Sequence, residues 1–320
     1  MIQVGNKVPG WTFESEFKEV VVSVICRMFG VLGLAAVGLS LSGSARAAEP
    51  PIVEIGMPKS LFQGIPKYLI DLGAAPFKKM MKANTGIDGN LQYPEDCMML
   101  ADKINEGKIH LGVFQGHEFA WAKKKYPDLM PIAVASPMQP VQVFFLVKWD
   151  CEAKNIGEFK NQKISLPPVH RDYCELYLAK QKELHMKGAT FTETIKAITD
   201  DDAVQDVIDG KSACTVMDGL KLKIYENIYP GKFKNLKILC QSEVIPNTCI
   251  AIKKGELDPR TIEKFQRALI NASTDAIGKP MLSTWRLKGF TAVPVDYDEQ
   301  IKVISKIYPT PPTRPASVEK

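Results

Sequence analysis

The chain has 320 residues, with 45% apolar and 24% charged side chains and a formal net charge of +5. These proportions are typical of a soluble globular protein with one large or two ordinary domains, and they exclude a fibrous or largely disordered chain. No run of lysine and arginine is long enough to indicate a nucleic-acid-binding protein. The short run Lys123–Lys125 is most simply a solvated helix face, and the alternative is that it helps to attract an anion.

The N-terminal segment has the pattern of an export signal. Arg27 precedes the uncharged apolar run Met28–Leu41, and Ala45-Arg46-Ala47 follows with the small residues of a cleavage site. The run is short for a membrane span. We therefore expect a signal peptide at residues 1–47, a periplasmic mature protein, and no membrane-embedded segment after cleavage.

Six cysteines remain after this cleavage point, and none of them forms a C-x-x-C pair, so a structural zinc site or a thioredoxin-like redox pair is not indicated. They are Cys97, Cys151, Cys174, Cys214, Cys240 and Cys249. An oxidising compartment permits disulfides, and a chain of this size can equally bury free thiols, so both interpretations stay open.

The first half of the mature chain alternates short apolar strands with amphipathic helices. After the loop Met57–Gly64, the helix Ala74–Thr85 is expected to hold Pro76 in its first turn and to end at Gly86. Asp96 is expected to cap its helix. The remaining expectations, in chain order, are strand Ile52–Gly56, strand Asn90–Tyr93, helix Asp96–Asn105, strand Ile109–Phe114, a helix from Glu118, and strands Pro131–Ala135 and Val141–Lys148.

The second half repeats this alternation. In chain order we expect strand Asn161–Leu166, helix Cys174–Leu184, strand Thr192–Ile198, helix Ala203–Ile208, strands Ser212–Met217, Leu236–Gln241 and Cys249–Ile252, and helix Pro259–Ser273. Ala101–Phe114 and Ala203–Asp218 each contain a helix, a Glu-Gly-Lys or Asp-Gly-Lys turn, an apolar strand and a polar turn. This repeat predicts two similarly built α/β lobes.

The order of these units resembles the type 2 periplasmic solute-binding proteins, in particular the phosphate, phosphite and phosphonate-binding branch of ABC importers. The matching segments are Val53–Pro58, Lys103–Trp121, Val204–Asp218, Ser242–Asn247 and Met281–Phe290. The resemblance implies an α/β fold of two lobes, each a mostly parallel sheet flanked by helices, with a ligand cleft between them. The lobes are expected at 48–148 plus 246–305 and at 149–245, with an extended tail at 306–320.

The resemblance also implies the ligand contacts. In the first lobe they fall on Ser60, Phe62, Tyr93, Gln115, Gly116, His117 and Phe119, and in the second lobe on His170, Arg171, Tyr173 and Asp218. The second-lobe turn 167–173 lacks the serine and threonine hydroxyls that are usual in this family. Backbone N–H groups at a helix N-terminus can still bind an anion, and Arg171 would add a charge-assisted contact.

We therefore expect a monomeric, non-enzymatic solute-binding protein without a cofactor, which captures a small oxyanion by lobe closure and delivers it to an ABC permease. The hinges are expected near Lys148–Cys151 and Gln241–Pro246. One alternative is a metal or metal-complex receptor that uses His117 and His170. Another is a periplasmic accessory protein whose cleft holds a partner. Enzyme motifs are absent from the sequence, and Glu118 with Asp218 is only a weak candidate for a catalytic carboxylate pair.

Overall fold

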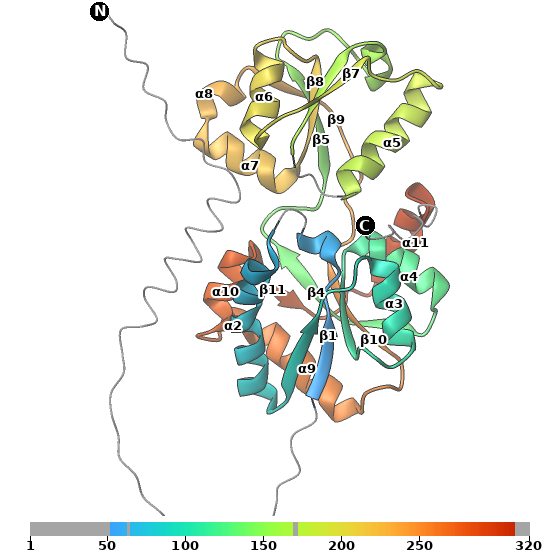
Figure 1. Ribbon diagram of the computed structural model, residues 1–320, viewed down its shortest axis with the longest axis vertical. Helices are drawn as coiled ribbons and strands as arrows, with labels where there is room; N and C mark the ends of the chain where they lie inside the picture. Colours follow the sequence, from blue (N-terminus) through green and yellow to red (C-terminus); the bar gives the residue numbers. More distant parts are fainter. Residues whose placement is uncertain (1–51, 63–64, 169–171, 311–320) are drawn as a thin grey trace, which may run out of the picture.

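The computed structural model describes residues 52–62, 65–168 and 172–310, which form two lobes with one β-sheet each (Figure 1). The first sheet has six strands in the order β11-β4-β10-β3-β1-β2, and the second has five in the order β7-β6-β8-β5-β9. These two sheets with their helices confirm the expected two-lobe α/β fold. The predicted signal peptide and the last ten residues lie outside the described residues.

Each strand expected from the sequence overlaps an observed strand, and β11 is an addition. The first lobe contains β1 (Ile52–Gly56), β2 (Asp88–Gln92), β3 (Leu111–Phe114), β4 (Leu129–Pro137), β10 (Cys249–Lys253) and β11 (Leu287–Thr291). The second lobe contains β5 (Val143–Lys148), β6 (Lys163–Leu166), β7 (Glu193–Lys196), β8 (Cys214–Asp218) and β9 (Leu236–Gln241).

Both sheets are mixed, and in each of them most strands run in one direction, as expected: β1, β2, β3 and β4 in the first sheet, and β6, β7, β8 and β9 in the second. In the first sheet β1 is parallel to β2 and β3, whereas β10 is antiparallel to β3 and β4. In the second sheet β6 is parallel to β7 and β8, whereas β5 is antiparallel to β8 and β9. The antiparallel strands β10 and β5 are those by which the chain enters each sheet from the other lobe, which explains their reversed direction.

The two sheets share one pattern of strand positions. The run β2-β1-β3-β10-β4 in the first sheet corresponds to β7-β6-β8-β5-β9 in the second, and in both the fourth strand, β10 or β5, comes directly after a crossing between lobes. The repeated helix–turn–strand unit of the sequence becomes the helix before β3 and the helix before β8, and these two strands hold equivalent positions.

Helices cover both faces of each sheet (Figure 1). In the first lobe α2, α9 and α10 share one buried cluster, and α3, α4 and α11 lie on the other face. The first-lobe helices are η1 (Lys59–Phe62), α2 (Lys67–Thr85), α3 (Cys97–Asn105), α4 (Gly116–Lys125), α9 (Pro259–Ile270), η3 (Asn271–Ser273), α10 (Gly278–Thr284) and α11 (Tyr297–Ile307). Those of the second lobe are η2 (Ile156–Phe159), α5 (Asp172–Met186), α6 (Asp200–Ile208), α7 (Gly219–Ile228) and α8 (Pro230–Phe233).

Helix α2 begins seven residues before its expected start, so Pro76 lies inside the helix and not in its first turn. The early turns bury Leu69 and Ile70, which continue the apolar face of the later turns. This burial offsets the cost of a proline that cannot donate a backbone hydrogen bond. The expected end is confirmed, because Gly86 is left-handed with φ 73° and closes the helix.

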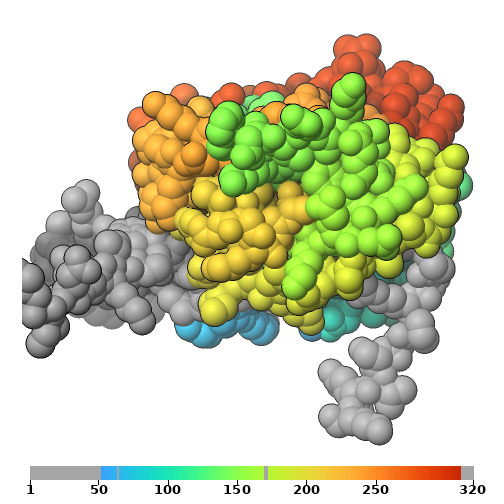
Figure 2. Space-filling view, turned by 90° about the horizontal axis from the view of Figure 1, so that it is seen from above, coloured from blue at the N-terminus to red at the C-terminus, as the bar shows by residue number. Residues whose placement is uncertain are grey.

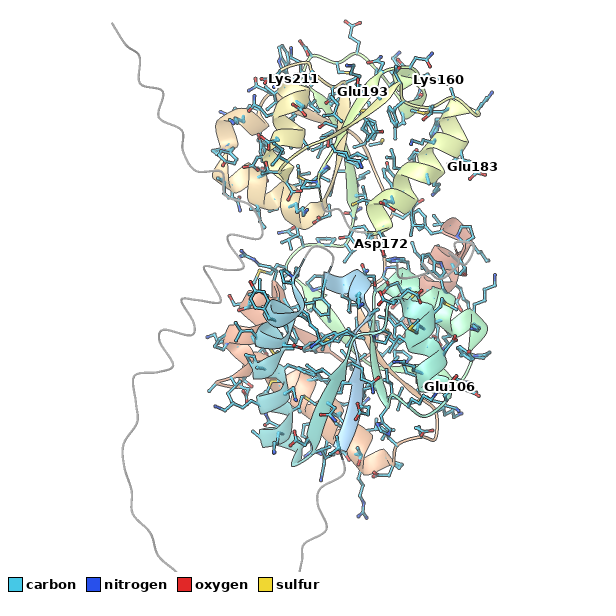
Figure 3. All side chains as sticks on the ribbon, viewed as in Figure 1. Glu106, Lys160, Asp172, Glu183, Glu193 and Lys211 are labelled. Carbon is cyan, nitrogen blue, oxygen red and sulfur yellow. The ribbon has the colours of Figure 1, made fainter. Side chains whose placement is uncertain are left out.

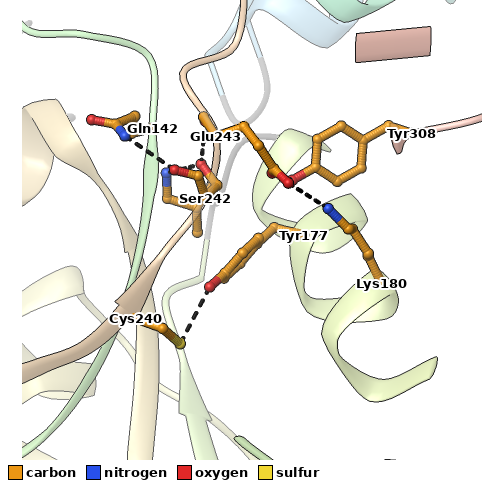
Figure 4. Close-up of polar contacts among 8 residues, drawn as sticks. Gln142, Tyr177, Lys180, Cys240, Ser242, Glu243 and Tyr308 are labelled. Atoms are coloured by element: carbon orange, nitrogen blue, oxygen red, sulfur yellow. Dashed lines mark hydrogen bonds and ion pairs between the residues drawn. The ribbon is translucent and has the colours of Figure 1, made fainter. Parts of the chain in front are cut away.

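Two segments connect the lobes, at 138–142 between β4 and β5 and at 242–248 between β9 and β10. Ser242 joins the two connections by hydrogen bonds. Its Oγ accepts from the Val143 backbone N–H at 2.9 Å, and its carbonyl accepts from Gln142 Nε2 at 3.0 Å (Figure 4). The first connection therefore precedes β5, and the expected hinge at Lys148–Cys151 lies too late in the chain. The reason is that β5 hydrogen-bonds with β8 and β9 in the second sheet.

Viewed along the long axis, the second lobe covers most of the first, and the red atoms of the last helix project at one side (Figure 2). One buried apolar cluster continues from α3, α4 and α11 into α5 and the second sheet, so the lobes share part of their core.

The six cysteines of the described part are thiols and form no disulfide there. Within the same residues no helix is long and apolar enough to cross a membrane.

Candidate functional site

The carboxyl ends of the parallel strands in the two lobes face one another. Helix α4 begins directly after β3, and helix α5 follows β6 across the interface. The rings of His117 on α4 and Tyr173 on α5 meet edge to face, with centroids 6.1 Å apart. Asp172, the first residue of α5, lies between the lobes (Figure 3). This arrangement brings the N-termini of α4 and α5, which follow β3 and β6, to one place, and the carboxyl ends of strands are where open α/β sheets bind ligands.

The first turn of α4 is held by a capping box. The side chain of Gln115 accepts from the backbone N–H of Glu118, and one carboxylate oxygen of Glu118 accepts from the backbone N–H of Gln115 at 3.0 Å. The second carboxylate oxygen accepts from Ser60 Oγ at 2.6 Å. Since Ser60 belongs to η1, which follows β1, Glu118 ties together the ends of two neighbouring strands.

Glu118 is a buried acid in acidic surroundings. Only 2% of its surface is exposed, and this burial raises the pKa of its carboxyl to about 7. The hydrogen bonds from Ser60 and Gln115 oppose the shift, whereas the charges of Asp172 and Asp96 add to it. Near neutral pH the carboxyl is therefore present in both its charged and its neutral forms.

His117 is fully buried and stays neutral. It contacts the edge of Trp121, with ring centroids 5.0 Å apart, and burial lowers the pKa of its imidazole to about 3. Neither ring nitrogen has a hydrogen-bond partner, and the same is true of Gln115 Nε2. Buried polar groups rarely lack partners, so this turn has hydrogen-bonding capacity left for a bound molecule.

Tyr93 and Phe62, two ligand contacts expected in the first lobe, lie close to each other, and the Tyr93 hydroxyl already has a hydrogen-bond partner. The Tyr93 hydroxyl donates to Asp71 Oδ1 at 2.9 Å, and its ring meets that of Phe62 edge to face at 6.1 Å. Phe62 also lines a small apolar cavity of about 50 Å³ under η1. The cavity is lined by Met57, Phe62, Ile65, Ile70, Gly73, Ala74 and Trp285.

In the second lobe Tyr173 is buried in the first turn of α5, and Asp218 caps α7 by accepting from the backbone N–H groups of Leu220 and Lys221 at 3.0 and 3.1 Å. Both N–H groups donate to Asp218 Oδ1, so this carboxylate is the N-cap of α7. His170 and Arg171 lie outside the described residues. The described part of the chain holds no group of three or more His, Cys, Asp or Glu side chains that could bind a metal ion.

Phe119 does not reach this site. It is fully buried between the rings of Phe114 and Tyr297, at centroid distances of 5.8 and 6.3 Å. Residues two apart on a helix lie on nearly opposite sides. His117 faces the second lobe, and Phe119 therefore faces the core. The expectation that Phe119 contacts a ligand disagrees with this placement.

Ser60, Gln115, Gly116, His117 and Tyr173 are thus brought together, and Glu118 of the same α4 turn joins them. The signal that could have identified it is the spacing of Gln115 and Glu118, which is that of a capping box. The bond from Ser60, by contrast, spans 58 residues of sequence.

Comparison with known proteins adds a family match. The family model described as ABC transporter, phosphonate, periplasmic substrate-binding protein matches residues 70–298. No curated protein sequence matches the chain.

Several solved structures share the fold at low sequence identity. XAC2383 from Xanthomonas citri bound to ATP is 13% identical with a TM-score of 0.58, over 80% of this chain and 96% of that one. PhnD1 from Prochlorococcus marinus in complex with methylphosphonate is 12% identical with a TM-score of 0.56, over 80% and 97%. A binding protein component of an ABC phosphonate transporter from Pseudomonas aeruginosa is 14% identical with a TM-score of 0.55, over 80% and 87%.

Proposed function

Because this chain belongs to the family of periplasmic phosphonate-binding components of ABC transporters, we propose that it captures a small oxyanion between its lobes and delivers it to an ABC permease. The observation that supports this most directly is the meeting of α4 and α5 across the interface, with His117 against Tyr173. Two helix N-termini that converge on one point favour a negatively charged ligand there.

The proposed mechanism is closure about the segments 138–142 and 242–248. Ligand contacts from the α4 turn in one lobe and the α5 turn in the other would stabilise the closed arrangement relative to the open one. Buried polar atoms without partners, Gln115 Nε2 and the His117 ring nitrogens, supply hydrogen bonds that an enclosed ligand can complete. In the second lobe, Arg171 remains a predicted ligand contact. Export directed by residues 1–47 also remains a prediction. We propose that the protein works as a monomer.

The proposal is tested by thermal unfolding and calorimetry of the full-length protein with phosphate, phosphite, methylphosphonate and sulfate. A ligand that binds only the folded state raises the midpoint, and at about a hundred times its dissociation constant the gain is about 2.7 kcal/mol. We expect such a shift with at least one of these anions and a smaller one in Arg171→Ala. If no anion shifts the midpoint, the oxyanion assignment is wrong, and an accessory protein with a partner-binding cleft becomes the better hypothesis.

A further inference from the structure

Glu243 lies in the second connection between the lobes and bonds to both of them. One carboxylate oxygen accepts from Lys180 Nζ on α5 of the second lobe at 2.5 Å, and the other accepts from the hydroxyl of Tyr308, which follows α11 of the first lobe, at 2.9 Å (Figure 4). Lys180 Nζ also lies over the Tyr308 ring, 5.3 Å from its centroid. These three side chains, here called the clamp, therefore contact one another across the boundary between the lobes.

The members of the clamp are themselves held in place. Tyr308 is 2% exposed, and its carbonyl accepts from Trp121 Nε1 on α4 at 2.8 Å. The backbone carbonyl of Glu243 accepts from Ser242 Oγ at 2.7 Å, and the same hydroxyl oxygen bonds to the first connection. Tyr308 and Lys180 belong to different lobes. Separating the lobes therefore breaks their mutual contact and at least one of the two bonds to Glu243.

The clamp is charged and partly sheltered from water. Lys180 keeps 22% of its side chain exposed, and Glu243 keeps 41%. Partial burial raises the pKa of the Glu243 carboxyl, but the hydrogen bonds from Lys180, its own backbone and Tyr308 lower it by more, so the pKa lies below its usual range. The carboxyl is therefore charged at neutral pH, and hydrogen bonds to an ionised group are roughly twice as strong as neutral ones.

The surfaces that the clamp joins are buried against each other by the protein's own side chains. His117 on α4 is fully buried, and its ring meets that of Tyr173 on α5. Cys174 on α5 is 1% exposed. It lies close to Tyr308, because burial raises the pKa of the Tyr308 hydroxyl and the charges of Glu243 and Cys174 add to this shift. The closed arrangement thus has its own stabilising contacts, both apolar and charged.

We propose that the clamp keeps the lobes closed before any ligand binds, so that the closed form is the resting state of this protein. The inference rests on the lobe movement of the proposed function and names what controls it. A ligand can enter only after the clamp has opened. Because the clamp is present in the resting form and in the closed form with ligand, it stabilises both equally. It therefore controls how fast a ligand enters and leaves, and not how tightly the ligand is bound.

The buried thiol of Cys174 provides the test, because it becomes accessible when the lobes part. Pulsed labelling of the ligand-free, full-length protein with N-ethylmaleimide, followed by mass spectrometry of its peptides, gives the rate for each cysteine. Cys214 on β8 and Cys249 on β10 lie inside the two sheets, are 0% exposed, and report unfolding of either lobe. We expect slow labelling of Cys174 in the unmodified protein and labelling at least about tenfold faster in Glu243→Ala, with both sheet cysteines unchanged.

Glu263→Ala is the matched control. Glu263 accepts from Arg267 Nη2 at 2.5 Å within α9, so this variant removes an equally short ion pair that does not cross between the lobes. It should leave the labelling rates unchanged. Lys180→Met is a second test, because it removes the charge that faces both Glu243 and the Tyr308 ring and keeps the apolar stem. It should accelerate labelling at the same thiol as Glu243→Ala.

Stopped-flow binding separates this inference from the proposed function. The probe is whichever of phosphate, phosphite, methylphosphonate and sulfate raises the unfolding midpoint most. In Glu243→Ala both its association and its dissociation rate constants should rise about tenfold, while the dissociation constant stays within about twofold.

Three outcomes are decisive. Rapid labelling of Cys174 in the unmodified protein, equal to that in Glu243→Ala and Lys180→Met, would overturn the clamp and leave the proposed function standing. So would weaker binding in Glu243→Ala with an unchanged association rate, because the lobes would then close only around the anion. A protected Cys174 that both variants expose, in a protein that binds none of the four anions, would support the clamp and overturn the oxyanion assignment.

Discussion

Glu118 and His117 are neighbours on the first turn of α4, and burial acts on them in opposite directions. It raises the pKa of Glu118 from 4.5 to about 7 and lowers that of His117 from 6.5 to about 3. Between pH 4.5 and 6.5 the folded protein holds a proton on Glu118 that the unfolded chain releases, and the unfolded chain holds one on His117 that the folded protein excludes. The two contributions to the pH dependence of stability oppose each other in this window.

Replacing His117 separates the contributions of His117 and Glu118 to the pH dependence of stability. The folded pKa of His117 is depressed, so its contribution to the free energy of unfolding is lost as the pH falls below 6.5. His117→Phe keeps a ring against Trp121 and Tyr173 and removes this loss. In urea denaturation we expect the variant to match or exceed the unmodified protein at about pH 7 and to exceed it by a further ~2 kcal/mol at about pH 5. An identical pH dependence in both proteins would contradict this account of His117.

The location of the candidate site was predictable from sequence, and its bonding was not. Apolar strands that end in polar turns placed Ser60, Tyr93 and Gln115 at strand ends, and the family resemblance placed Tyr173 in the opposite lobe. The partnership of Ser60 with Glu118 depends on the pairing of β1 with β3, which brings residues 58 positions apart together. Phe119 was misplaced because the resemblance supplies a position along the chain and not the side of the helix that faces the cleft.

At the scale of elements, the start of α4 fits against the segment that returns from the second lobe. A Cβ at Gly116 would lie 2.0 Å from the Pro246 carbonyl oxygen and 2.5 Å from its carbon. These are backbone atoms of the connection 242–248, so they cannot turn aside as a side chain can. Glycine is therefore required at this position by close approach.

Gly116→Ala should consequently push α4 and the connection apart. We expect the free energy of unfolding to fall by about 1–3 kcal/mol, as in other overpacked sites. Gly231→Ala in α8 is the matched control, because a Cβ there meets nothing within 4 Å, and it should leave stability unchanged or slightly improved. Urea denaturation of both variants measures the difference, and equal midpoints would show that the connection yields to the extra methyl.

Whether a segment forms a helix or a strand was easier to predict than the residues at which it begins and ends. Gly86 past α2 and the Asp96 cap of α3 follow from local chemistry, and both were predicted correctly. The early start of α2 was missed because Pro76 was interpreted as a start signal, and only packing against the sheet shows that the helix continues through it. Which strands run against the others could not be predicted for a similar reason, since β5 and β10 have the same apolar pattern in either orientation.

At the scale of the whole molecule, Tyr308 connects both lobes at the end of α11. Its carbonyl accepts from Trp121 Nε1 on α4 at 2.8 Å, and its hydroxyl donates to Glu243 Oε2 at 2.9 Å. The other oxygen of Glu243 accepts from Lys180 Nζ on α5 at 2.5 Å (Figure 4). An extended tail was expected from residue 306. Instead α11 continues to Ile307 and its end packs against the second lobe, so Tyr308 is buried.

Tyr308→Phe removes the hydroxyl bond between α11 and the second connection. We expect a loss of about 1 kcal/mol in the free energy of unfolding and, in X-ray scattering of the ligand-free protein, a larger radius of gyration from looser lobes. Tyr126→Phe is the control, because its hydroxyl donates to Asp102 at 2.7 Å within the first lobe. It should lose similar stability without a change in scattering. A radius unaltered in Tyr308→Phe would mean that the lobes are held by other contacts.

The strand order also has a consequence for synthesis. All strands of the second sheet lie between Val143 and Gln241, whereas the first sheet begins at Ile52 and is complete only with β11 at Thr291. Until β10 emerges from the ribosome, β3 has an unpaired edge where the middle of its sheet will form. A nascent chain can therefore finish its second lobe while the first, begun earlier, still lacks its central strand. We therefore expect the lobe whose synthesis begins first to complete its sheet last.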